Sequence, residues 1–180
     1  MNKLIEGDRY RWTGGEKKAI VTVPQYRFMK AKRKSERGGI FSCFWRFRYK
    51  KWQRKYLSEV PSSVKMGPGV YIGHLGGILI NKDVVIGKNV NILNGVLLGY
   101  SPARSGHAGG TPVIGDQVWI GTNAAIVGKV TIGDNVLIAP NAYVNFDMPS
   151  NSIVIGNPGK IIKSEHATEG YCNNLFWEKE

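Results

Sequence analysis

The 180-residue chain has few side chains that form cross-links or bind metal ions, since it contains two cysteines, Cys43 and Cys172, and three histidines. Two thiols without CxxC spacing exclude a disulfide framework and a zinc finger. No apolar run approaches the roughly 20 residues that span a bilayer, and the start, "MNKLIEGDRY", lacks the apolar segment of a secretory signal. We therefore expect a cytoplasmic protein with reduced cysteines.

Acidic residues are also scarce, and the deficit is local. The formal net charge is +12; residues 1–60 hold 17 Lys and Arg against 5 Asp and Glu, whereas the other 120 residues hold 8 of each kind. The first third also carries 11 of the 19 aromatic residues. This break predicts a basic, aromatic-rich helical unit over 1–58, a second domain over 59–163 and a tail over 164–180.

The second unit repeats every six residues. Repeats begin at Ile86, Ile92, Ile114, Ile120, Ile126, Ile132 and Ile138. Their fifth residue is always Val or Ala, and Gly is the commonest second residue. Small and β-branched residues at this spacing, with turn formers between them, are typical of a solenoid of short strands. A strict period of six excludes an amphipathic helix and leaves an ordinary β-sandwich as the alternative.

The repeat is interrupted twice, and each interruption contains a histidine. The step from Ile72 to Ile80 is eight residues and includes His74. The step from Leu98 to Ile114 is sixteen and leaves an extended loop at about 99–112, with His107 in it. Because insertions in a solenoid are places where function is added, both are candidate sites.

With these repeats, and with a closing "VIGNPGKII" similar to the family's terminal G-x-P-A-[KR] segment, the chain resembles the hexapeptide-repeat acyltransferases over roughly 61–163. The resemblance implies a mainly β fold, a left-handed parallel β-helix, preceded here by a short basic α-helical N-terminal unit. It also implies a homotrimer.

The first interruption is similar to the D-H-x-x-G segment of serine acetyltransferases. In "GHLGG", His74 takes the place of the catalytic histidine and Gly73 that of the neighbouring aspartate. The family's orienting aspartate falls on Glu59. The resemblance thus implies that His74 removes a proton from an acceptor hydroxyl while Glu59 orients the imidazole. His107 is the next candidate for the base.

The resemblance also implies acetyl-CoA as cosubstrate, bound in a groove between neighbouring subunits, and no metal. The implied contacts are Gly99, Tyr100, Thr122, Asn123, Ala139, Pro140 and, for the phosphates, Lys160. From the residues alone, small side chains one coil apart permit close backbone approach, and a lysine suits a phosphate. The alternative is that these are corner residues and a solvated cation.

The acceptor is where the likeness to serine acetyltransferases weakens. Thr111 stands where those enzymes carry a second histidine, and the long helical domain before their β-helix is replaced by a short basic unit. The nearer likeness is to relatives associated with surface polysaccharide synthesis. We therefore expect a saccharide or lipid-linked glycan as the acceptor, with serine O-acetylation in cysteine biosynthesis as the alternative.

The basic unit contains two segments of helical length, each with cations among aromatics. Phe41, Phe44, Trp45, Tyr49, Trp52 and Tyr56 recur at steps of three and four. Such a face suits peripheral contact with the inner face of an anionic membrane through residues 26–57, or packing on the β-helix or on a neighbouring subunit. A nucleic-acid-binding module remains the alternative of another class, although no nucleic acid is expected as a partner. Three histidines in a coil, a loop and a tail argue against a metal enzyme of the carbonic anhydrase type.

Overall fold

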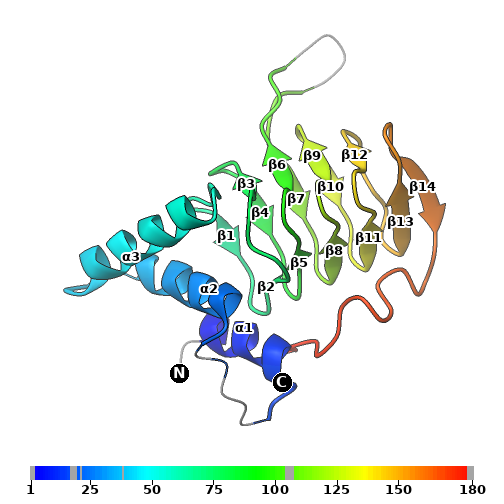
Figure 1. Ribbon diagram of the computed structural model, residues 1–180. Helices are drawn as coiled ribbons and strands as arrows, with labels where there is room; N and C mark the ends of the chain where they lie inside the picture. The colour runs from blue at the N-terminus through cyan, green and yellow to red at the C-terminus, as the bar shows by residue number, and fades with distance from the viewer. Residues whose placement is uncertain (1–2, 17–19, 21, 38, 104–107, 178–180) are drawn as a thin grey trace.

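A computed structural model describes residues 3–16, 20, 22–37, 39–103 and 108–177. The chain forms three helices followed by a parallel β-helix, whose coils stack side by side in Figure 1. The helices are α1 (Lys3–Thr13), α2 (Pro24–Ser35) and α3 (Ser42–Lys55). The strands are β1 (Lys65–Met66), β2 (Tyr71–Ile72), β3 (Leu79–Ile80), β4 (Val85–Ile86), β5 (Asn91–Ile92), β6 (Leu97–Gly99), β7 (Val113–Ile114), β8 (Val118–Ile120), β9 (Ala125–Val127), β10 (Thr131–Ile132), β11 (Val136–Ile138), β12 (Tyr143–Val144), β13 (Ser152–Ile155) and β14 (Lys160–Lys163).

From β1 to β12, every third strand belongs to the same sheet. The first sheet has the order β1-β4-β7-β10, the second β14-β13-β11-β8-β5-β2, and the third β12-β9-β6-β3. All pairs are parallel except β13 with β14, which closes the last coil as an antiparallel pair. Three strands therefore complete one turn, and the predicted left-handed parallel β-helix of hexapeptides is confirmed.

The interior of the β-helix is built from the first and fifth residues of each repeat. The repeat isoleucines point inward and are at most 2% exposed. The fifth residues are buried beside them, at Val90, Val96, Val118, Ala124, Val130, Val136 and Ala142. Because the register is fixed from coil to coil, each isoleucine stacks on the isoleucine or leucine of the next coil, as Ile114 does on Ile86 and Ile132.

Turn chemistry explains the polar part of the repeat. Asn89 and Asn135 have φ values of 57° and 50°, a left-handed conformation that asparagine tolerates better than most residues. Glycine at the second position of the repeat has a packing role. A Cβ on Gly115 would lie 2.8 Å from the backbone carbonyl carbon of Gly133 in the next coil. Glycine thus permits the close stacking of coils that the repeat requires.

The N-terminal helices cover the open end of the β-helix rather than forming a separate body. Phe28 and Met29 of α2 are at most 1% exposed and join the same core as Val60 and Met66. The sequence predicted two helical segments, and the described part of the chain has three. The additional helix, α1, packs against α2 and β2.

A buried ion pair fastens α1 and α2 to the first coil. The Arg33 guanidinium donates to both carboxylate oxygens of Asp8, at 2.8 and 3.1 Å, and to the carbonyl oxygens of Met66 and Gly67. Asp8 also accepts a hydrogen bond from the amide of Val70. These contacts give both buried charges a nearly complete set of partners.

The tail returns along the second sheet to the helices, as Figure 1 shows. Tyr171 packs edge-on against Trp119, with ring centroids 5.0 Å apart. Asn91 donates to the Tyr171 carbonyl and accepts from Arg11 of α1. The outer face of the second sheet is thereby covered. No helix in the described part of the chain is long and apolar enough to cross a membrane.

Candidate active site

The two extra residues of the first interruption form a wide turn that presents His74 to solvent. The turn joins β2 to β3, and His74 is exposed while its neighbour Leu75 packs against the core. Backbone hydrogen bonds anchor the glycines after it: Gly77 donates to the Tyr56 carbonyl, and Gly76 accepts from the amide of Gly95. The imidazole is therefore held on a fixed backbone with its ring accessible.

The glycine before His74 lies close to a side chain of the next coil. A Cβ at Gly73 would lie 2.6 Å from Cδ2 of Leu93 in the next coil. An aspartate at this position, as in the similar segment of serine acetyltransferases, would require Leu93 to move. This methyl group is the end of a flexible, partly exposed side chain, so the packing does not by itself require glycine at position 73.

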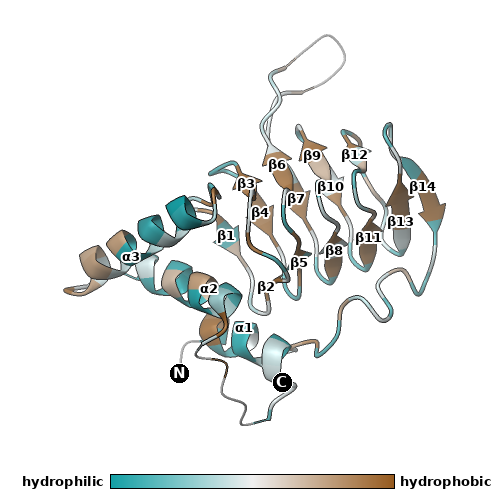
Figure 2. Cartoon of the chain, in the orientation of Figure 1, coloured by the Kyte–Doolittle hydropathy of each residue, from teal (hydrophilic) through white to brown (hydrophobic). Residues whose placement is uncertain are grey.

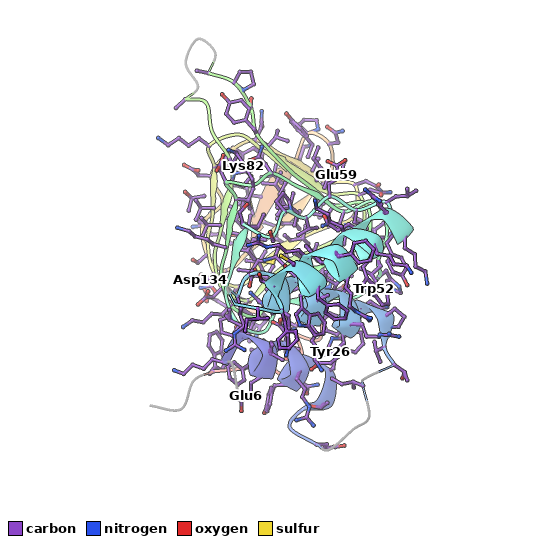
Figure 3. The ribbon with its side chains drawn as sticks, turned by 90° about the vertical axis from the view of Figure 1, so that its left-hand side faces the viewer. Glu6, Tyr26, Trp52, Glu59, Lys82 and Asp134 are labelled. Atoms are coloured by element: carbon purple, nitrogen blue, oxygen red, sulfur yellow. The ribbon has the colours of Figure 1, made fainter. Side chains whose placement is uncertain are left out.

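Glu59 lies in the segment between α3 and β1, beside the His74 turn. It bridges Leu79 in parallel register, with hydrogen bonds from the Glu59 amide to the Ile78 carbonyl and from the Ile80 amide to the Glu59 carbonyl, both 2.8 Å. Figure 3 shows Glu59 near the carboxyl-terminal end of α3. Its carboxylate is exposed, and no hydrogen bond joins it to His74 in the described part of the chain. The expected pairing is therefore not formed in this conformation.

Four of the expected cofactor contacts share one corner of the β-helix with His74. Thr122 and Asn123 lie between β8 and β9, and Ala139 and Pro140 lie between β11 and β12. Hydrogen bonds link successive coils along this corner, from Asn123 to the Asn94 carbonyl and from Asn141 to the Thr122 carbonyl. We call this stack of turns, from 73–77 through 93–95 and 121–123 to 139–141, the corner ridge.

Lys160 extends the corner ridge at the far coil. It opens β14 opposite Ile155, and the amide of the preceding Gly159 donates to the Tyr143 carbonyl at 3.0 Å. A Cβ on Gly159 would lie 2.7 Å from that carbonyl oxygen, so the alanine usual in the family would not fit here without a shift. The Lys160 side chain is exposed.

Gly99 and Tyr100 lie at the opposite edge of the third sheet, where the long loop leaves the β-helix. The loop is closed at its base by two 3.0 Å hydrogen bonds between Ser101 and Gly110. Thr111 follows it and donates to the Asp83 carbonyl. Within one chain, these residues and the corner ridge lie on opposite edges of one sheet. His107 lies outside the described residues.

Nothing in the described part of the chain groups three or more His, Cys, Asp or Glu side chains in a way that would hold a metal ion. His166, in the tail, is exposed and lies 3.1 Å from Glu169. The chemistry that the described residues offer at this site is therefore that of the accessible His74 imidazole on its anchored turn.

One residue that contacts this turn was missed by the sequence reasoning. Gln25, in the first turn of α2, donates from Nε2 to the Gly73 carbonyl at 3.0 Å, while its Oε1 is buried without a hydrogen-bond partner. This contact ties the helix to the backbone beside His74. No motif marks Gln25, because its role depends on how α2 docks on the first coil.

Comparison with known proteins finds a family model that matches part of this architecture. The model of the bacterial transferase hexapeptide (six repeats) matches residues 111–145. The matched residues lie within the repeats that form the β-helix. Its match to serine acetyltransferase from Staphylococcus aureus is 37% identical over 112 residues and covers 62% of this chain and 52% of that protein. Its match to Arabidopsis thaliana serine acetyltransferase 2 is 34% identical over 105 residues and covers 58% of this chain and 32% of that protein.

Among solved structures, this chain is similar to Neisseria gonorrhoeae serine acetyltransferase in complex with serine. The TM-score is 0.72 at 27% identity, and the match covers 89% of this chain and 68% of that one. The chain spans between a third and about half of the curated relatives cited above. These relatives are serine acetyltransferases, and the nearer likeness to polysaccharide-associated acetyltransferases that the sequence predicted is not supported by them.

Proposed function

We propose that this protein is an acetyl-CoA-dependent O-acetyltransferase with His74 as its general base. The observation that carries the proposal is the position of His74, exposed on an anchored turn at one end of the corner ridge. In the reaction, the imidazole removes the proton of an acceptor hydroxyl, and the oxygen attacks the thioester carbonyl. The C–S bond then breaks, and the thiolate takes a proton from the imidazolium.

The corner ridge is the proposed track for acetyl-CoA. From β2 to β14, which begins at Lys160, there are five strand spacings of about 4.8 Å, so His74 and Lys160 are separated by roughly 24 Å along the stack. An extended pantetheine arm fits such a track, with the thioester near His74 and the phosphates near Lys160. The backbone groups of Thr122, Asn123, Ala139 and Pro140 lie between these ends.

Glu59 is the proposed orienting group for the imidazole. Its carboxylate is exposed, and its backbone forms an isolated bridge with Leu79, five residues beyond His74. In proteins without substrate, such hydrogen bonds are often long and shorten when the complex forms. We infer that Glu59 accepts the proton of one ring nitrogen when the acceptor occupies the other.

A homotrimer would complete the site. The outer faces of the first and third sheets expose apolar side chains, with Val85, Val113, Leu79 and Leu97 between 36% and 45% exposed, whereas the second sheet is covered by α1 and the tail. Contiguous apolar faces of this kind favour subunit contacts. Packing of copies on these faces would bring Gly99, Tyr100 and Thr111 of one subunit to the corner ridge of its neighbour.

L-Serine is the acceptor that the relatives favour, because the cited relatives are serine acetyltransferases. A saccharide hydroxyl is the second candidate, and Thr111 is the observation that favours it. A site for an amino acid must provide partners for both charged ends. The Thr111 hydroxyl is already a donor to the Asp83 carbonyl and carries no charge.

The test is an acetyl-CoA consumption assay run in parallel with L-serine, small sugars and extracted glycan intermediates. Each product is identified by its mass. Formation of O-acetylserine alone would support serine as the acceptor, and acetylation of sugars alone would support the second candidate. Failure to release the thiol with any hydroxyl acceptor would contradict the proposed acetyl transfer.

A further inference from the structure

The end of the helical hairpin α2–α3 exposes large apolar side chains. Ile40 is 95% exposed, Phe41 73%, Phe47 70% and Phe44 53%. Figure 2 shows hydrophobic residues at this end of α3, which projects away from the β-helix, and hydrophilic residues at the other end. Four such side chains within eight residues form a patch of the kind that marks an interaction surface.

The same hairpin carries a large excess of positive charge. Residues 24–55 contain twelve Lys and Arg and one acidic residue, Glu36. Lys32 and Arg33 are buried and paired with Glu36 and Asp8. The other ten cations form no ion pair in the part of the chain that the structure describes. The apolar end is therefore surrounded by charges that favour an anionic partner.

A small cavity between the two helices combines these features. Its volume is about 180 Å³, and it is lined by Tyr26, Arg27, Lys30, Ala31, Trp45, Arg48 and Trp52. Figure 3 labels Tyr26 on α2 and Trp52 on α3. The Nε–H of Arg48 is buried without an acceptor.

The aromatic walls of the cavity hold its cations in place. The Arg27 guanidinium lies 5.2 Å from the ring centroid of Trp52, and that of Arg48 lies 5.9 Å from the ring centroid of Trp45. Three cations line the cavity and no carboxylate does. A phosphate group would supply the missing acceptor and the missing negative charge.

We propose that this hairpin docks on the surface of an anionic phospholipid bilayer. Ile40, Phe41, Phe44 and Phe47 enter the boundary between headgroups and acyl chains, while Arg27, Lys30 and Arg48 bind a headgroup phosphate. Trp45 and Trp52 are partly buried and pack against the hydrophobic core, so the side chains that enter the bilayer are those of the exposed apolar end. The inference is independent of the proposed acetyl transfer.

Two other occupants fit the surface less well. A second copy of the same hairpin would bring two sets of unpaired cations together, which is unfavourable. A nucleic acid would satisfy the cations but would leave the aliphatic side chain of Ile40 and the adjacent phenylalanines without an apolar environment. A bilayer accommodates both features at once.

The first experiment measures sedimentation of the full chain with vesicles. Binding is expected to vesicles of equal parts phosphatidylcholine and phosphatidylglycerol, to weaken with salt, and to be absent with phosphatidylcholine alone. Phe41→Ser/Phe47→Ser and Lys30→Gln/Arg48→Gln should each lower the affinity by roughly tenfold or more. The control, Lys88→Gln/Lys163→Gln, removes the same charge from the β-helix and should change the affinity by less than about threefold.

A second measurement reports insertion directly. Cys43 is exposed at the apolar end, whereas Cys172 is buried and its pKa is raised to about 11, so a polarity-sensitive thiol dye labels Cys43 selectively. The emission should shift to the blue with anionic vesicles and stay unchanged with duplex DNA. The proposal fails if the dye does not respond to vesicles, if the control loses as much affinity as the hairpin variants, or if the hairpin variants dissociate an oligomer in the absence of lipid.

Discussion

At the scale of single residues, burial sets the chemistry of the Cys172 thiol. Burial raises its pKa from 9.0 to about 11, and the nearby Arg11 guanidinium only partly offsets this. Between these two pH values the unfolded chain loses the proton and the folded chain keeps it, so the stability falls as the pH rises through this window.

We predict that Cys172→Ala removes this contribution. Denaturant unfolding from pH 8 to pH 11.5 should show the free energy of unfolding of the wild type falling by about 2 kcal/mol more than that of the variant. Other groups that titrate at alkaline pH are present in both proteins, so their contributions to the free energy of unfolding cancel in the difference. The buried Tyr49, whose pKa is raised well above 10.0, is one of them. Parallel pH profiles would show that Cys172 keeps its ordinary pKa in the folded state.

The sequence predicted the candidate base but not its surroundings. His74 was identified because an eight-residue step breaks a strict period of six, and the structure shows the wide turn that this insertion forms. The sequence predicted that Glu59 pairs with His74, but the Glu59 carboxylate is exposed and no hydrogen bond joins the two residues in the described part of the chain. Gln25 left no signal, since its hydrogen bond to Gly73 arises only when α2 docks.

At the scale of elements, α1 and α2 depend on the buried pair of Arg33 and Asp8. Removing one member leaves the other charge buried without its partner, which costs about 3–5 kcal/mol. We predict that Arg33→Ala lowers the free energy of unfolding by this amount, whereas Arg37→Ala, in an exposed position of the same helical hairpin, changes it by less than about 0.5 kcal/mol. Urea denaturation followed by circular dichroism measures both. Similar losses in the two variants would show that the pair contributes little.

The elements were predictable where their buried faces are apolar. The hexapeptide strands and the aromatic steps of α3 follow from periodicity, and the segment of α2 follows from its helical length, but no such signal marks α1. Its buried positions include Gly7, Asp8, Arg11 and Thr13, so no apolar stripe recurs at steps of three and four. The composition break gave no sign that the basic unit and the β-helix share one core. Phe28 and Met29 of the basic unit belong to the same hydrophobic cluster as the interior of the β-helix.

At the scale of the whole molecule, the exposed apolar faces predict assembly. Leu97→Glu would place a charge in the face of the third sheet, where it is unfavourable in a subunit contact. We predict that sedimentation equilibrium gives three times the monomer mass for the wild type and mainly monomer for Leu97→Glu. Leu57→Glu, 81% exposed at the end of α3, serves as the control and should remain trimeric. A wild-type monomer that transfers acetyl groups would contradict a site shared between subunits.

The rate of thiol release from acetyl-CoA, compared between the wild type and His74→Ala with the acceptor that the wild type uses, tests the central claim most directly. Removal of a general base is expected to lower the turnover by about 10² to 10⁴-fold. Binding of coenzyme A, measured by calorimetry, should be retained, and the exposed His166→Ala should keep the wild-type rate. A His74→Ala protein with a near wild-type rate would contradict the assignment of His74 as the base.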